Sequence, residues 1–202
     1  MSGKWIAVMI VAGLFVFLGL GTCSSYNGIV IDNQVVKGKW SEAQNQLKRR
    51  NDLIPNLVAT VKGYAEHERG TFNEVAEARA QVGKALNIDP AKLANEPLLQ
   101  KQMLEAQKNL SASLGRLIAI AENYPQLKAD QNFLRLQDEL AGTENRISVA
   151  RGRAIAATQD FNARVVRFPT SLVARMAGLG EKPYYEATEA EQAVPVVDFG
   201  KK

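Results

Sequence analysis

Apolar residues recur at seven-residue intervals along most of the chain, which is the spacing of helices that pack in bundles and coiled coils. Two such rows run side by side: Trp40, Leu47, Ile54, Val61, Glu68, Val75 and Val82, with Ala43, Arg50, Leu57, Tyr64, Thr71, Ala78 and Ala85. Few helix-breaking residues interrupt positions 30–86. The pattern therefore predicts one long helix there, kinked at Pro55, whose nitrogen cannot donate a backbone hydrogen bond.

Two further apolar rows predict two more long helices. The segment Asn87-Ile88-Asp89-Pro90 ends the first helix, and a second helix is expected from about Pro97 to Asn123. Asp130 is a suitable N-cap for a third helix. The apolar rows of these two helices are Leu99, Met103, Ala106, Leu110, Ser113, Leu117, Ile120 and Tyr124, and then Phe133, Leu140, Ile147, Ala154, Phe161 and Phe168.

No stretch alternates between apolar and polar residues for long enough to predict a β-strand in this part of the chain. We therefore predict an all-α protein, with three long helices packed as an elongated antiparallel bundle over residues 26–177. Residues Leu172 to Met176 would add a short helix. Residues 178–202 are expected to form an extended tail, pinned by Tyr184, Tyr185 and Phe199, with Val194–Val197 docking on a neighbour or pairing as a short strand.

An apolar run precedes the bundle. No charged residue occurs between Lys4 and Asp32, and Trp5 to Thr22 forms an apolar stretch of about 18 residues. That length suits a transmembrane helix and exceeds the apolar centre of most cleaved signal peptides. The sequence therefore predicts a short tip at residues 1–4 and a single-pass anchor at residues 5–25, with the lipid bilayer as a partner.

Cys23 allows an alternative to the uncleaved anchor. Leu20-Gly21-Thr22-Cys23 resembles a bacterial lipoprotein processing site, although Thr22 stands where such sites have Gly, Ala or Ser. A lipid on Cys23 and an uncleaved helix would both hold the bundle at a membrane. Because Cys23 is the one cysteine of the chain, it forms no intrachain disulfide.

The side of the membrane that carries the bundle follows less directly from the sequence. Counting basic residues favours the cytoplasm, since Lys37, Lys39 and the Lys48-Arg49-Arg50 group lie on the bundle side. Long domains cross membranes regardless of charge, however, and one amino-terminal lysine before an apolar run is typical of a signal anchor. We expect the bundle on the periplasmic side.

Two long segments carry a family resemblance. The first runs from Gln46 to Glu68 and is preceded by Tyr26-Asn27-Gly28 and Trp40-Ser41, and the second runs from Leu117 to Ile147. With Arg167–Ser171 and Phe199 they resemble the LemA family of bacterial membrane-anchored helical proteins, over about residues 26–199. The resemblance implies an all-helical fold at the bacterial cell membrane and implies no particular reaction. Gly152 and its neighbours depart from the family pattern, so no family role is transferred to residues 151–160.

Arg50 is the main candidate for a functional polar residue, because it occupies a position in the apolar row. A buried arginine needs a carboxylate partner, since burying it unpaired costs several kcal/mol. Glu144 is the first candidate for this partner, and Asp138 or Glu139 is the next. A structural polar network or interface is predicted for Arg49, Arg50, Asp52, Asn56, Glu68, Gln137, Glu144, Asn145 and Arg146. The alternative is that these residues form a solvated face.

Groups that support catalysis are scarce. His67, the one histidine, lies in Glu66-His67-Glu68, but di-iron bundles and zinc-protease helices need a second histidine. We find no glycine-flanked nucleophile and no Gly-rich phosphate loop. The net charge of +4 is mild, with no basic stripe that would favour nucleic acid. We expect no enzymatic activity, no metal and no cofactor.

Two functions fit these features. The first is a membrane-anchored scaffold that forms homo-oligomers at the bacterial cell envelope, because elongated bundles expose long flanks. The second is an adaptor that presents a groove to a peptide or to another membrane protein, with exposed apolar anchors.

Overall fold

The structure is a computed structural model that describes the backbone of residues 3–184 and, within that range, the side chains outside residues 3–8 and 14–20. The described range is helical and contains no strand, as predicted. Its elements are α1 (Gly3–Lys62), α2 (Arg69–Leu86), α3 (Pro90–Leu93), α4 (Pro97–Ile120), the 3₁₀ turn η1 (Ala121–Asn123), α5 (Pro125–Lys128), α6 (Gln131–Val165) and α7 (Thr170–Met176).

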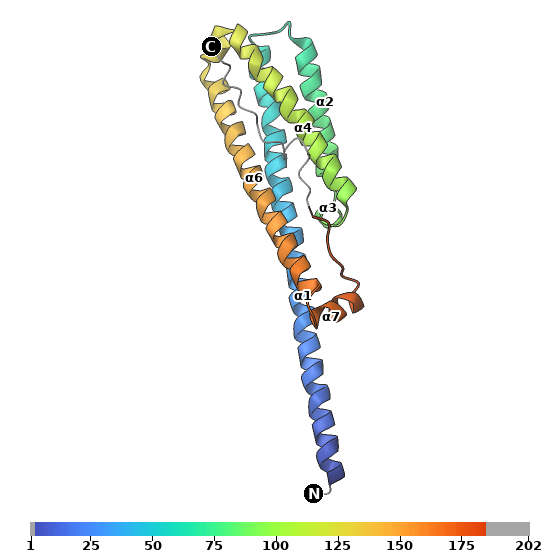
Figure 1. Cartoon of the computed structure of the whole chain (residues 1–202). Helices are drawn as coiled ribbons and strands as arrows, with labels where there is room; N and C mark the ends of the chain where they lie inside the picture. The colour runs from blue at the N-terminus through green and yellow to red at the C-terminus, as the bar shows by residue number, and fades with distance from the viewer. Residues whose placement is uncertain (1–2, 185–202) are drawn as a thin grey trace, which may run out of the picture.

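Four long helices form the bundle, and successive long helices run in opposite directions (Figure 1). Helix α1 packs mainly along α6, and α2 packs mainly along α4. The predicted single helix over residues 30–86 is therefore wrong, because the chain leaves the helix at Gly63 and resumes it at Arg69. The reversal lets α2 fold back beside α4, which a continuous helix would not allow.

The break at residues 63–68 has a physical cause in the apolar rows. Beyond Val61 the next row positions are Tyr64, Glu68 and Thr71, which would place polar groups in the core of a continuous helix. Instead, the amides of Tyr64 and Ala65 both bond to the Val61 carbonyl oxygen, at 3.0 Å. Ala65 is buried, and Tyr64 turns outward. The polar residues at these positions of the apolar rows were the sequence feature that marked the end of the helix.

The core has two clusters of buried side chains. One joins the distal half of α1 to α2, α4 and the start of α6, and includes Ile54, Leu57 and Phe133. The other joins the middle of α1 to the end of α6 and to α7, and includes Ile29 and Phe161. The apolar row of α6 is buried from Phe133 to Phe161, as predicted.

Phe168 was predicted to end that row in the core, and this is wrong. Its side chain is 81% exposed. Helix α6 ends at Val165, three residues before Phe168, so the seven-residue repeat no longer fixes which way the side chain points. Pro169 disfavours helical backbone at Phe168, the residue that precedes it, so α6 is not expected to continue through Phe168.

Helix α1 extends far beyond the bundle toward the N-terminus (Figure 1). Its 60 residues form one unbroken helix of about 90 Å, at about 1.5 Å per residue. The predicted anchor, residues 5–25, lies in this extension, and the side chains of residues 5–8 and 14–20 lie outside the described ones. Among the described residues, no helix has a stretch both long and apolar enough to cross a membrane.

The start of the tail is held by Asn162 of α6, and Tyr184, one of the residues predicted to pin the tail, does not pack in the core. The Asn162 amide donates to the Lys182 carbonyl oxygen at 2.8 Å and accepts from the Lys182 backbone N–H at 2.8 Å. The Lys182 ammonium lies 4.9 Å from the centre of the Phe161 ring. Tyr184 is exposed. Tyr185, Phe199 and the Val194–Val197 segment lie outside the described residues.

Two aspartates cap helices, and the cap at Asp130 was predicted from the sequence. Asp89 accepts a hydrogen bond from the Ala91 amide at the start of α3, and Asp130 accepts one from the Phe133 amide at the start of α6. Asp130 also accepts a 2.9 Å hydrogen bond from the Tyr64 hydroxyl, which ties the start of α6 to the turn after α1. These hydrogen bonds, the Phe133 amide first, hold the pKa of the Asp130 carboxyl below its usual value.

The Asp130 cap makes a pH-dependent contribution to stability. A carboxyl whose pKa is depressed in the folded state stabilises that state above its unfolded pKa, and this stabilisation is lost as the pH falls through the folded pKa. We expect Asp130→Ala to lower the thermal midpoint at neutral pH, and the difference from wild type to narrow below about pH 4. Circular dichroism melts across this range measure it, with Asp138→Ala as the control. If the difference in thermal midpoint between wild type and Asp130→Ala stays the same in acid, the Asp130 carboxylate does not stabilise the fold through these hydrogen bonds.

Candidate functional site

The polar contact of greatest interest joins three helices through the Arg50 side chain. Arg50 lies on α1 and is 7% exposed. Its Nη1 lies 2.8 Å from Glu144 Oε2 on α6, and its Nη2 donates to Ser111 Oγ on α4 at 3.0 Å. Burial lowers the pKa of Arg50, and the Glu144 charge opposes this shift. The guanidinium therefore sets the position of α1 relative to both neighbours.

Glu144 keeps this contact at the edge of the core. Its side chain is 56% exposed, whereas that of Arg50 is 9% exposed. The charged head of Arg50 thus reaches from a core position toward solvent, while its stem packs inside. The alternative partners, Asp138 and Glu139, are exposed on the surface of α6.

The other predicted polar residues are dispersed. Arg49, Asp52, Asn56, Asn145 and Arg146 are exposed, and Glu68 and Gln137 are half-buried. Among the residues that the structure describes, Arg50 and Glu144 are the two of the nine that pair with each other. A network or interface role for the full set stays a prediction.

Charged pairs along α1 and α6 were not singled out from the sequence. Asp32 pairs with Arg164 at 2.9 Å, and Glu42 pairs with Arg153 at 3.0 Å. In these two pairs the acid lies on α1 and the arginine on α6, whereas in Arg50–Glu144 the arginine lies on α1 and the acid on α6. The order of these charges along the two helices could have indicated from the sequence how α1 and α6 align. Exposed pairs of this kind contribute about 0–1 kcal/mol each, and they favour one register over its neighbours.

A second polar feature missed from the sequence lies one residue after Arg50. Asn51 is 8% exposed, and its carbonyl oxygen accepts a 3.2 Å hydrogen bond from Arg79 Nε of α2. Its side-chain Oδ1 is buried with no hydrogen-bond partner among the described residues. Arg50 and Asn51 thus connect α1 to all three other long helices, at the middle of the bundle.

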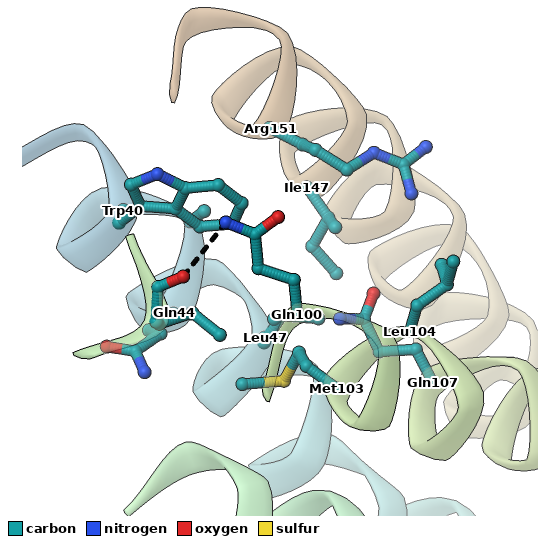
Figure 2. A pocket seen from close by; sticks show the side chains of 11 residues that line it. Trp40, Gln44, Leu47, Gln100, Met103, Leu104, Gln107, Ile147 and Arg151 are labelled. Atoms are coloured by element: carbon teal, nitrogen blue, oxygen red, sulfur yellow. Dashed lines mark hydrogen bonds between the residues drawn. The ribbon is translucent and has the colours of Figure 1, made fainter. Parts of the chain in front are cut away.

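A small cavity lies near this level, between α1, α3, α4 and α6 (Figure 2). Its volume is about 20 Å³, which suits about one water molecule. Small-molecule sites measure about 300–1,000 Å³. Gln100 Nε2 donates to the Leu93 carbonyl oxygen at 2.9 Å beside it. The lining residues are Trp40, Ala43, Gln44, Leu47, Leu93, Gln100, Met103, Leu104, Gln107, Ile147 and Arg151. This cavity is too small for a cofactor.

The remaining candidates for chemistry lie apart. His67 is exposed in the turn between α1 and α2, and Cys23 is exposed on the α1 extension. Over the described residues, no group of three or more His, Cys, Asp or Glu side chains lies close enough to hold a metal ion.

The chain belongs to the LemA family, whose sequence pattern matches residues 39–199. This confirms the resemblance found in the sequence, and family membership suggests a membrane-associated, non-enzymatic protein.

Curated relatives carry two kinds of name. The chain is 25% identical to magnetosome protein MamQ 2 of Paramagnetospirillum magneticum, over 91% of this chain and 73% of that protein. It is 25% identical to magnetosome protein MamQ of Magnetospirillum gryphiswaldense, over 82% and 66% of the two chains. It is also 25% identical to protein LemA of Metamycoplasma hominis, over 89% and 76%. None of these names is that of an enzyme.

Proposed function

We propose that this protein is a non-enzymatic helical scaffold, anchored in the bacterial cell membrane by the start of α1 and self-assembling at the cell envelope. The observation that carries the proposal is the continuity of α1. One helix of 60 residues joins the apolar N-terminal run to the bundle without a break. A continuous helix fixes the spacing along its axis, so the bundle stands at a set distance along α1 from whatever holds the N-terminal end.

The apolar run supports the membrane part of the proposal. Trp5 to Thr22 would measure about 27 Å as a helix, close to the roughly 30 Å of a bilayer core. In the described part of the extension, residues 9–13 and 21–24 are exposed, so the bundle does not cover them. We place the anchor as a single pass and the bundle on the periplasmic side.

The shape of the bundle supports the assembly part. Among its exposed apolar side chains, Ile31 is 61% exposed, Val35 46% and Val149 48%. They lie on the paired helices α1 and α6. Apolar side chains along a charged flank suit a lateral contact with a second copy, which buries them and pairs the charges around them.

The membrane part can be tested with charges in the anchor. We expect wild-type protein to stay with the membrane fraction during alkaline carbonate extraction. We expect Val11→Arg with Leu14→Arg to be released, because each charge costs about 2.5–3.5 kcal/mol at the centre of a membrane helix. Leu98→Arg with Leu134→Arg, at two exposed positions of the bundle, is the matched control and should stay. Extraction of the wild type would contradict an anchor.

An adaptor is the second candidate. Its support is an open hollow of about 300 Å³ between α2 and α4. The hollow is lined by three apolar residues and five polar or charged ones: Ala85, Ile88, Ala106, Gln81, Lys84, Gln102, Glu105 and Asn109. A side chain of a partner peptide with an apolar stem and a polar end would suit this lining. A protein that stays monomeric and retains one partner after crosslinking would favour this function over the scaffold.

A further inference from the structure

An apolar patch stands exposed around α7. Phe168, Leu172 and Met176 are 81%, 55% and 89% exposed. Leu172 and Met176 lie one helical turn apart on the same face of α7. Phe168 lies just before the start of this helix, in the turn between α6 and α7. Ala174, on the opposite face, is 1% exposed and packs in the core. We call Phe168, Leu172 and Met176 the α7 patch.

The position of α7 decides what covers this patch. Helix α7 packs against α1 and α6, at the end of the bundle from which the α1 extension emerges (Figure 1). The Arg164–Asp32 contact of 2.9 Å sets the end of α6 beside the start of the α1 core. A Cβ on Gly28 would lie 2.9 Å from Arg164 Nη1, so this level is near Gly28.

The distance from this level to the apolar run is short. Gly28 lies six positions after Thr22, a rise of about 9 Å along a helix. The headgroup layers add about 5–8 Å to each side of a bilayer core. The few ångströms that remain between the headgroup layer and the level of Gly28 are within the reach of side chains as long as Phe and Met. A bilayer around the start of α1 would therefore reach the level of the α7 patch.

Charge complements this position. Arg167 and Arg175 flank the patch and are exposed, and within the described residues neither forms an ion pair. Apolar side chains flanked by arginines are typical of helices that lie in a membrane interface, where the apolar side enters the lipid and the cations meet acidic headgroups.

We propose that the α7 patch inserts into the interfacial layer of an anionic bilayer, so that the protein touches its membrane at α7 as well as through α1. This second contact rests on the proposed membrane anchor. One helix alone leaves the bundle free to tilt and to rotate about α1. A second contact fixes the tilt and the rotation of the bundle. Every copy then presents the same flank at the same distance from the membrane, which favours lateral assembly.

The experiment uses full-length protein in a Cys23→Ser background, with nitroxide labels at Phe168→Cys or Met176→Cys. Leu134→Cys is the matched control, since Leu134 is 44% exposed and lies at the start of α6, at the other end of the bundle. The protein is reconstituted in vesicles with phosphatidylglycerol. Collision rates of each label with oxygen, which enters lipid, and with a water-soluble nickel chelate are measured.

We expect the ratio of oxygen to nickel collisions to be several-fold higher at residues 168 and 176 than at residue 134. Phosphatidylcholine vesicles, or Arg167→Gln with Arg175→Gln, should lower that ratio. A label at residue 176 that meets water as freely as the control overturns the inference. So does a label shielded from both reagents, which would indicate cover by a second copy or another segment. Flotation separates the two proposals: protein that fails to float with vesicles refutes the α1 anchor itself.

Discussion

Replacing Phe161 by alanine is expected to lower the free energy of unfolding by about 3–5 kcal/mol. Phe161 is 0% exposed and belongs to the cluster that ties the end of α6 to α1 and α7. Its ring also lies under the Lys182 ammonium, at 4.9 Å, where the tail leaves the bundle. Truncation would open a cavity and remove this contact, so both the core and the start of the tail lose support.

Thermal unfolding of the detergent-solubilised full-length protein measures this effect. A loss of this size lowers the midpoint by on the order of 10 °C in a chain of this length. Phe168→Ala is the matched control, with the same residue type one heptad later in the sequence. Because Phe168 is 81% exposed, its substitution should change stability by less than about 0.5 kcal/mol. Equal effects of the two substitutions would contradict the packing described above.

The second large effect is expected at the Arg50–Glu144 contact. Glu144→Gln should destabilise the protein by about 2 kcal/mol, because it leaves the Arg50 charge nine-tenths buried without a carboxylate. The loss is smaller than for a fully buried pair, since the Glu144 side chain is 56% exposed and water replaces part of the interaction. Arg50→Met removes the charge itself and should cost less than Glu144→Gln.

A double-mutant cycle tests this assignment. Once Arg50 is methionine, Glu144→Gln has no buried charge to expose, and its cost should fall to a few tenths of a kcal/mol. Chemical unfolding of the four proteins provides the free energies. If Glu144→Gln costs the same in both backgrounds, the contact does not tie α1 to α6.

Helix periodicity predicted most of the core of this protein. The rows from Trp40 and from Phe133 are buried where they lie within α1 and α6. Two predictions were wrong, the continuation of the first helix through Glu68 and the burial of Phe168, and both lie beyond the point where a helix ends. Periodicity shows which face of a helix packs and does not show where the helix stops. At Glu68 the polar residues of the row marked the stop, and at Phe168 the following proline did.

The polar contacts were predictable only in part. Arg50 stood out because it interrupts an apolar row, and an acid on a facing helix was the natural partner. Ser111 and Arg79 could not be found in the same way, since they lie on exposed or half-exposed positions of α4 and α2. Their contacts depend on how α2 folds back, and the single-helix prediction for residues 30–86 had hidden that reversal.

Assembly is the central claim, and the mass and shape of the full-length protein in mild detergent test it most directly. Light scattering with particle imaging distinguishes the alternatives in one preparation. The scaffold predicts a discrete oligomer of fixed size, with bundles side by side and their α1 extensions gathered at one end. A monomer at micromolar concentration would contradict self-assembly, and the adaptor function would then take its place.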